Sequence, residues 1–146
     1  MIKRAISEKI LHYARQYPVI TITGPRQSGK TTLCKALFPK RQYFSLENID
    51  TRNYAKNDPR AFLAECHKDG AIIDEIQRVP ELVSYIQEIV DTKDKPGHFI
   101  LTGSQNFHLL NTVSQSLAGR TALAVLLPFS YAEIYSDKAT PIDKVL

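Results

Sequence analysis

Cysteines are scarce in this sequence, and it has no long hydrophobic run. Only Cys34 and Cys66 occur, and they form neither a CxxC pair nor the spacing of a secreted disulfide framework. Because unpaired cysteines fit a reducing compartment, we expect a cytoplasmic protein. No apolar run approaches the roughly 20 residues of a membrane-spanning helix, and the start, MIKRAISEKILHYARQ, is too polar for a signal peptide. We therefore expect no membrane partner.

Runs of like charge and clusters of metal ligands are also absent from the sequence. Because no run of like charges marks a binding tail, the net charge of +4 permits contact with nucleic acid but does not indicate it. The four histidines (12, 67, 98 and 108) show no metal-ligand spacing, and the neighbours Cys66 and His67 are badly placed to chelate one ion together. We predict no zinc site.

What is present is the composition of an ordinary globular domain. The chain has 146 residues, of which 43% are hydrophobic and 23% are charged. This length suits one domain and allows a substantial core.

Short apolar runs alternate with segments of helical periodicity along the chain. Strands are predicted over residues 19–23, 42–46, 71–74, 99–102 and 121–127. Helices are predicted over residues 7–16, from 29 or 30 to 37, in two parts within 47–68, after Pro80, and over 107–117. The break within 47–68 falls at Asp58, the expected N-cap, and Pro59, the expected first helical residue. Since parallel strands need crossover helices, this alternation predicts an α/β fold with a parallel five-stranded sheet and helices on both faces.

A glycine-rich loop lies between the first predicted strand and the helix that follows. It fits the pattern G-x-x-x-x-G-K-[ST], in which backbone N–H groups surround a phosphate at the positive end of a helix. We expect Lys30 to reach the β- and γ-phosphates, the Thr31 hydroxyl to bind Mg²⁺, and Thr32 to contact the α-phosphate. The expected nucleotide-binding residues are Gly24, Pro25, Arg26, Gln27, Ser28, Gly29, Lys30, Thr31 and Thr32.

Two carboxylates, Asp74 and Glu75, end the third predicted strand. We expect Asp74 to hold Mg²⁺ through a water molecule and Glu75 to act as general base on the attacking water. Taken alone, the pair also fits a solvated strand end, but its position beyond the phosphate loop favours the functional interpretation.

Two further positions are candidates for catalytic roles. Ser104, just after the fourth strand, is expected to hold the water or sense the γ-phosphate, because α/β sheets bind ligands at the carboxyl ends of their strands. Helix capping by Ser104 or Asn106 is the alternative. Arg120 is a candidate arginine finger, in its own site or in that of a neighbour, and a plain surface arginine is the alternative.

The guanine-reading motif of GTPases, [NT]KxD, has only a superficial counterpart here. Residues 92–95 read Thr-Lys-Asp-Lys, so the fourth residue is lysine, and the segment precedes the fourth predicted strand instead of following a late one. The sequence therefore favours ATP over GTP.

Several segments together resemble one known family. GPRQSGKTTL, AIIDEIQRVPELVSYIQEIVD, HFILTGSQNFHLL, SLAGR and LPFSYAEI occur in this order. They resemble the AAA-type ATPases of prokaryotes that usually carry a C-terminal domain of unknown function. The resemblance implies a P-loop NTPase fold, a three-layer α-β-α sandwich of the ASCE type with strand order 5-1-4-3-2, and it implies ATP and Mg²⁺ as cofactors. By motif position it implies loop roles for Lys30 and Thr31, an acidic-pair role for Asp74 and Glu75, and a sensor role for Ser104.

The end of the sequence carries the start signal of a helix. Residues 130–133, Ser-Tyr-Ala-Glu, form a capping box, yet only a short tail interrupted by proline follows. We expect residues 1–130 to form the ATPase domain and residues 131–146 to begin a further region. A short terminal helix is the alternative.

The leading functional hypothesis is Mg²⁺-dependent ATP hydrolysis, with slow turnover because a homo-oligomer or a partner protein supplies the assisting arginine. A nucleotide-dependent switch with negligible hydrolysis and a small-molecule kinase are the alternatives.

Overall fold

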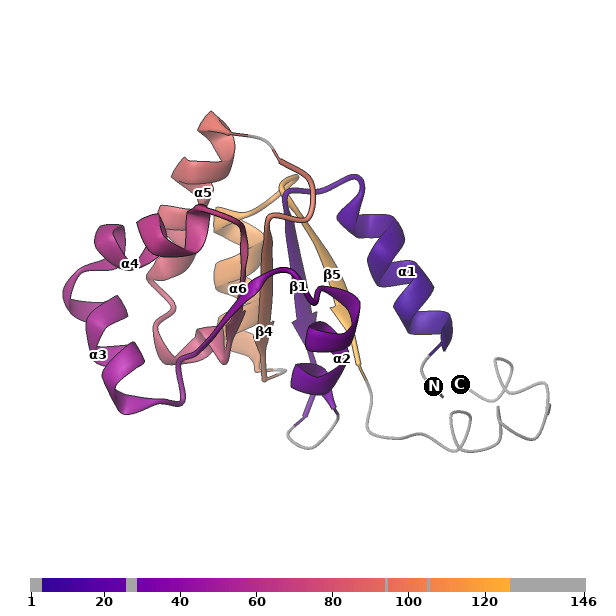
Figure 1. Cartoon of the computed structure of the whole chain (residues 1–146), viewed down its shortest axis with the longest axis horizontal. Helices are drawn as coiled ribbons and strands as arrows, with labels where there is room; N and C mark the ends of the chain where they lie inside the picture. Colours follow the sequence, from indigo (N-terminus) through magenta and orange to yellow (C-terminus); the bar gives the residue numbers. More distant parts are fainter. Residues whose placement is uncertain (1–3, 26–28, 94, 105, 127–146) are drawn as a thin grey trace.

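The computed structural model describes residues 4–25, 29–93, 95–104 and 106–126 (Figure 1). The helices are α1 (Arg4–Ala14), α2 (Lys30–Leu37), α3 (Ile49–Asn57), α4 (Pro59–His67), the short 3-10 helix η1 (Ile76–Arg78), α5 (Leu82–Thr92) and α6 (Phe107–Ser116). The strands are β1 (Val19–Thr23), β2 (Gln42–Ser45), β3 (Ala71–Asp74), β4 (Phe99–Gly103) and β5 (Thr121–Val125).

The strands form one parallel sheet in the order β2-β3-β4-β1-β5. Counted from the opposite edge, this is the order 5-1-4-3-2 that the family resemblance implied, so that expectation is confirmed. β4 lies between β1, which precedes the glycine-rich loop, and β3, which ends in the acidic pair.

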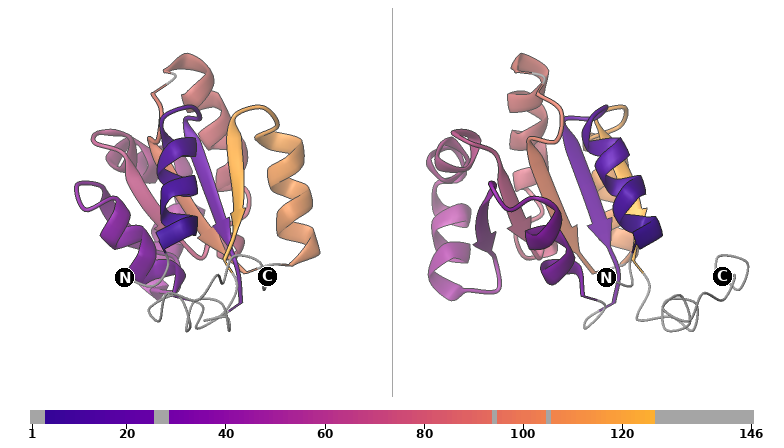
Figure 2. Two further views of the ribbon diagram at one scale, coloured as in Figure 1. Left: turned by 90° about the vertical axis from the view of Figure 1, so that its right-hand side faces the viewer. Right: turned by 45° about the vertical axis from the view of Figure 1, so that its right-hand side comes forward.

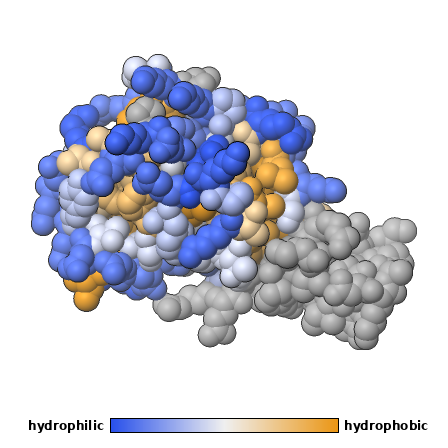
Figure 3. Space-filling view, viewed as in Figure 1, coloured by the Kyte–Doolittle hydropathy of each residue, from blue (hydrophilic) through white to orange (hydrophobic). Residues whose placement is uncertain are grey.

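Helices cover both faces of the sheet, which confirms the three-layer α/β architecture (Figures 1 and 2). On one face α1 and α2 pack on a core that includes Ile20, Ile22 and Ile100. On the other face α3 to α6 pack on a core that includes Val19, Ile73 and Leu101. The two sets alternate along β1 and β4 because successive side chains of a strand point to opposite faces. The described surface that faces the viewer in Figure 3 is mostly hydrophilic.

Local chemistry explains where the helices begin. The Asp58 side chain accepts a hydrogen bond of 3.2 Å from the Ala61 N–H, and Pro59 occupies the first turn of α4, as predicted. Asn106 caps α6 in the same way, accepting from the Leu109 N–H at 2.7 Å. Helix α1 begins earlier than predicted, at Arg4 in place of Ser7, because the 3.6-residue pattern marks the buried face better than the ends of a helix.

The predicted tail, residues 131–146, and its capping box lie outside the described residues. None of the described helices is long and apolar enough to cross a membrane.

Candidate functional site

Three neighbouring strands end together at one edge of the sheet. β1 ends at Thr23, β3 at Asp74 and β4 at Gly103, and the Gly24 N–H donates to the Gly103 carbonyl at 3.2 Å. Since the strands are parallel, their carboxyl ends meet at this edge. The glycine-rich loop and the acidic pair are therefore brought together, although some 50 residues separate them in sequence.

Lys30 is the first residue of α2, and its side chain lies within the glycine-rich loop. Gly29, just before it, has a φ of 85°, a conformation that glycine adopts without steric cost. The Lys30 residue is only 6% exposed, and its Nζ donates to the carbonyls of Gly24 at 2.8 Å and Pro25 at 3.1 Å. A buried ammonium group at the start of a helix thus faces the loop.

The Asp74 carboxylate accepts hydrogen bonds from three hydroxyl groups. Thr31 Oγ1 donates to Asp74 Oδ2 at 2.9 Å, Tyr43 Oη donates to the same oxygen at 2.5 Å, and Thr102 Oγ1 donates to Oδ1. Asp74 is only 5% exposed. A nearly buried carboxylate is tolerated here because hydrogen bonds satisfy its oxygens.

The sequence pattern did not indicate Tyr43 or Thr102 as a hydrogen-bond partner of Asp74. Tyr43 lies on β2, the strand beside β3. Burial, and then its hydrogen bond to Asp74, raises the pKa of Tyr43 to about 12, so the phenol stays a proton donor at neutral pH. Thr102 is a hydroxyl residue one position before the end of β4. Hydroxyl residues near strand ends are too common for this position alone to indicate a site residue.

Glu75 follows Asp74 directly and adopts an unusual backbone conformation. Its φ of 63° makes it the only described non-glycine residue with a positive φ. This left-handed conformation carries strain for a residue with a Cβ atom, and such strain is typical of functional sites. The Glu75 N–H donates to Thr102 Oγ1 at 3.1 Å, which attaches the turn after β3 to β4.

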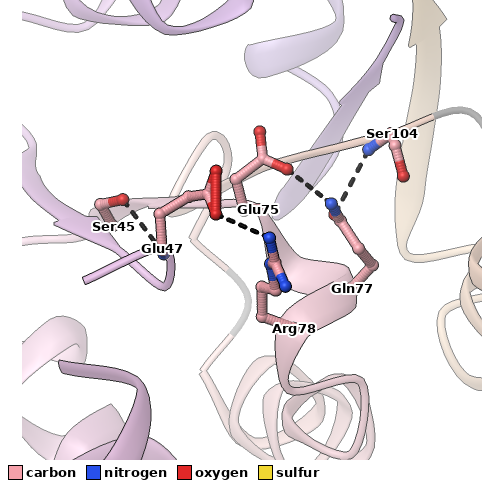
Figure 4. A network of polar contacts seen from close by, with 6 residues as sticks. All are labelled: Ser45, Glu47, Glu75, Gln77, Arg78 and Ser104. Carbon is pink, nitrogen blue, oxygen red and sulfur yellow. Dashed lines mark hydrogen bonds and ion pairs between the residues drawn. The ribbon is translucent and has the colours of Figure 1, made fainter. Parts of the chain in front are cut away.

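The Glu75 side chain belongs to a polar network at the same edge of the sheet (Figure 4). Gln77 Nε2 donates to Glu75 Oε1 at 2.5 Å, and Gln77 Oε1 accepts from the Ser104 N–H at 3.3 Å. Nearby, Arg78 forms an ion pair of 2.9 Å with Glu47. The structure therefore connects the Ser104 backbone to the Glu75 carboxylate through Gln77.

The other predicted residues differ in position. Thr32 is exposed in the first turn of α2. Arg26, Gln27 and Ser28 lie outside the described residues. Asn106, not Ser104, caps α6, and Ser104 Oγ instead accepts from Asn106 Nδ2 at 3.1 Å.

Arg120 lies at the amino ends of β1 and β5, whereas the glycine-rich loop follows the carboxyl end of β1. Its carbonyl accepts from the Val19 N–H at the start of β1, and β1 is five residues long, which separates its ends by roughly 13–16 Å. The Arg120 guanidinium pairs with Asp91 at 2.5 and 3.0 Å. The side chain therefore does not reach the loop of its own chain in this structure.

The donors at this edge suit a phosphate chain and a hard cation. An ammonium group and the N-terminus of α2 attract anions, whereas the Thr31 hydroxyl and the Asp74 carboxylate are oxygen ligands of the kind that Mg²⁺ prefers. These two oxygens lie 2.9 Å apart, so the two side chains would hold one cation together. The residues present therefore fit a magnesium ion.

Comparison with known proteins identifies similar sequences and folds. The model of a family described as "AAA domain" matches residues 16–135. Uncharacterized proteins of Mycobacterium tuberculosis (Rv2008c) and Mycobacterium bovis (Mb2031c) are 33% identical over 141 residues, which cover 94% of this chain and 31% of each relative. The chain thus spans about a third of the length of these relatives.

Solved structures share the fold at low sequence identity. A Walker-type ATPase of Pyrococcus abyssi has a TM-score of 0.55 at 16% identity and covers 98% of this chain and 61% of its own. A DNA replication initiation factor has a TM-score of 0.55 at 15% identity, covering 92% of this chain and 48% of its own. A signal transduction ATPase with numerous domains from Pyrococcus horikoshii has a TM-score of 0.54 at 18% identity, covering 97% of this chain and 26% of its own. These likenesses support the fold alone.

Proposed function

The chain belongs to the AAA domain family, and from this premise we propose that it binds ATP with Mg²⁺ and hydrolyses the γ-phosphate. The observation that carries the proposal is the 2.9 Å hydrogen bond between Thr31 and Asp74. It joins the glycine-rich loop to the acidic pair, and these are the two parts that a P-loop ATPase combines around the phosphates and the metal.

Each residue of the site has a defined part in this proposal. Lys30 exchanges its contacts with the Gly24 and Pro25 carbonyls for oxygens of the β- and γ-phosphates. Thr31 and Asp74 would hold the metal, which, when bound, would neutralise charge on the phosphates. Glu75 accepts a proton from the water that attacks the γ-phosphorus in line, and Ser104 senses the γ-phosphate.

The chemistry requires positioning and charge stabilisation more than covalent participation by the protein. Of the described arginines discussed above, Arg120 lies at the opposite end of β1 and Arg78 is engaged in an ion pair with Glu47. We therefore propose slow turnover by the isolated chain and an assisting arginine from a partner protein or a second copy.

A comparison of two glutamate variants tests the proposal. The purified chain is incubated with ATP and Mg²⁺, and phosphate release and equilibrium ATP affinity are measured separately. We expect Glu75→Gln to lower the rate of phosphate release by about 100-fold or more, because a general base contributes about 10²–10⁴-fold, while ATP affinity is retained. Glu81→Gln is the matched control, because Glu81 is exposed and its side chain does not cap α5.

The outcomes separate the alternative functions. Tight ATP binding without phosphate release, in the wild type and in Glu75→Gln alike, would show a nucleotide-dependent switch. Phosphate transfer to an added small molecule in place of release to water would show a kinase. Absence of ATP binding at any Mg²⁺ concentration would refute the nucleotide site itself.

A further inference from the structure

Gln77 connects the predicted general base to the neighbouring strand. It lies in η1, just after the acidic pair, and is half-buried. Its amide nitrogen donates to Glu75 Oε1 at 2.5 Å, and its amide oxygen accepts from the Ser104 N–H at 3.3 Å. We call these three residues the Gln77 bridge (Figure 4).

The side-chain amide of Gln77 occupies space at the end of β4 that is open because residue 103 is glycine. A Cβ atom at Gly103 would lie 2.8 Å from Gln77 Oε1 and 2.6 Å from Leu109 Cδ2. Both distances are shorter than van der Waals contact, so a side chain at position 103 would displace the Gln77 amide or Leu109. The position of Gln77 over the strand end therefore depends on this glycine.

The end of β4 holds Glu75 at two points. The Glu75 N–H is bonded to Thr102 Oγ1, and the Glu75 carboxylate is bonded through Gln77 to the Ser104 backbone. Among the residues that the structure describes, Gln77 is the only side chain that hydrogen-bonds this carboxylate, and it does so at Oε1. Oε2 is thus the oxygen that a water molecule would use.

We propose that Gln77 is a positioning residue that sets the orientation of the Glu75 carboxylate relative to the end of β4. The inference rests on the proposed hydrolysis, in which Glu75 is the general base. The Glu75 side chain has three rotatable bonds, and a misplacement of about 1 Å costs about 100-fold in rate. An amide fixed at one end by the Ser104 N–H restricts those rotations, and it links the base to the residue that is placed to sense the γ-phosphate.

The kinetic test replaces the amide by a side chain of similar length. Gln77→Met removes both hydrogen bonds, and we expect kcat for phosphate release to fall by about tenfold or more, because the base is less well oriented. KM and the equilibrium affinity for ATP should stay within about threefold of wild type, since the hydrogen bonds of Gln77 to described residues go to Glu75 and Ser104 and not to Lys30, Thr31 or Asp74. Gln115→Met is the matched control, because Gln115 is exposed on α6, and it should leave both constants unchanged.

A second variant separates the two ends of the Gln77 bridge. Gln77→Glu keeps an acceptor for the Ser104 N–H but replaces the donor to Glu75 by a like charge. We expect a loss of kcat at least as large as in Gln77→Met. In ¹⁵N-labelled protein without nucleotide, the Ser104 amide resonance should move in Gln77→Met, because it loses its acceptor, and move less in Gln77→Glu.

The outcomes distinguish failure of this inference from failure of the proposed function. If the wild type hydrolyses ATP but Gln77→Met changes kcat by less than about threefold, or raises it, Gln77 does not position the base. A parallel loss of ATP affinity and kcat would overturn the inference as well, because it indicates a general structural role. If the wild type releases no phosphate, the proposed function and the inference fall together.

Discussion

Thr31 and Asp74, which lie on α2 and β3, are joined by a hydrogen bond of 2.9 Å between a hydroxyl and a carboxylate. The same carboxylate oxygen accepts from Tyr43, and the other accepts from Thr102. Elements from three strands and one helix therefore converge on one side chain. Hydrogen bonds within the chain thus hold the residues of the proposed magnesium site together, which lowers the cost of assembling its ligands.

Removal of either metal ligand is predicted to weaken the Mg²⁺ dependence of ATP binding. In a Glu75→Gln background, where hydrolysis does not interfere, we expect Thr31→Val and Asp74→Asn each to raise the Mg²⁺ concentration that supports ATP binding by about tenfold or more, since even the loss of an outer-shell partner costs about 10–100-fold in metal affinity. In the double variant, this Mg²⁺ concentration should rise by less than the product of the two single increases, because both side chains act on one ion. Asp69→Asn is the control, because Asp69 is an exposed carboxylate just before Gly70. If the increase in the double variant equals the product of the two single increases, Thr31 and Asp74 act independently.

The second prediction concerns the ammonium group in the glycine-rich loop. Lys30→Ala removes the donor to the Gly24 and Pro25 carbonyls, and we expect ATP affinity to fall by about tenfold or more, since about 1.4 kcal/mol of lost contact corresponds to tenfold. The measurement is equilibrium ATP binding, with circular dichroism to confirm folding. Lys56→Ala, at an exposed position of α3, should bind as the wild type does. Retained affinity in Lys30→Ala would remove the basis of the loop assignment.

The strands were accessible from the residue pattern and their order from the family resemblance, but the packing of the site was accessible from neither. Val19–Thr23 and Ala71–Asp74 are short, apolar and fully buried, and such runs between helical segments are a strong signal for parallel strands. The bridging role of Gln77 depends on the left-handed conformation of Glu75 and on the space at Gly103. Neither follows from residue spacing, because both arise from contacts between separate strands.

The position of Arg120 relative to the site could be predicted from the order of the strands and helices. Arg120 comes immediately before β5, and a residue that precedes a parallel strand lies at the edge opposite to the carboxyl ends. The interpretation of Arg120 as a finger for its own chain conflicts with this rule. The pairing with Asp91, by contrast, joins elements that are distant in sequence and could not be predicted from it.

Comparison of Arg120→Ala with Asp91→Ala tests the role of this ion pair. Both changes remove this ion pair, and Arg120→Ala also removes the hydrogen bond from Arg120 Nη1 to the Ala118 carbonyl. A structural role therefore predicts small effects of both on thermal stability and no change in the rate of ATP hydrolysis per chain. The rate is measured over a range of protein concentrations, because a finger supplied by a second copy acts only when copies associate. If turnover per chain rises with concentration in the wild type and in Asp91→Ala but not in Arg120→Ala, Arg120 acts as a finger in a neighbouring site.

The buried thiols are predicted to make stability fall as the pH becomes strongly alkaline. Burial is the main cause that raises the pKa of Cys34 and Cys66 from 9.0 to about 12. Between these values the unfolded thiols lose their protons while the folded thiols retain them, so the unfolded state is favoured as pH rises. Each thiol contributes a slope of at most about 1.4 kcal/mol per pH unit, which urea unfolding from pH 8 to 11 measures.

Two variants separate this linkage from other groups that titrate in the same range. Cys66→Ala should flatten the decline in the free energy of unfolding, because one of the two thiols no longer ionises on unfolding. Val113→Ala is the control, since Val113 is buried in the same core as Cys66 but has no titrating group. It should lower stability by a similar amount at every pH and leave the slope unchanged. Parallel curves for the wild type and Cys66→Ala would mean that Cys66 ionises at a similar pH in the folded and unfolded chains, and that its burial does not oppose thiolate formation.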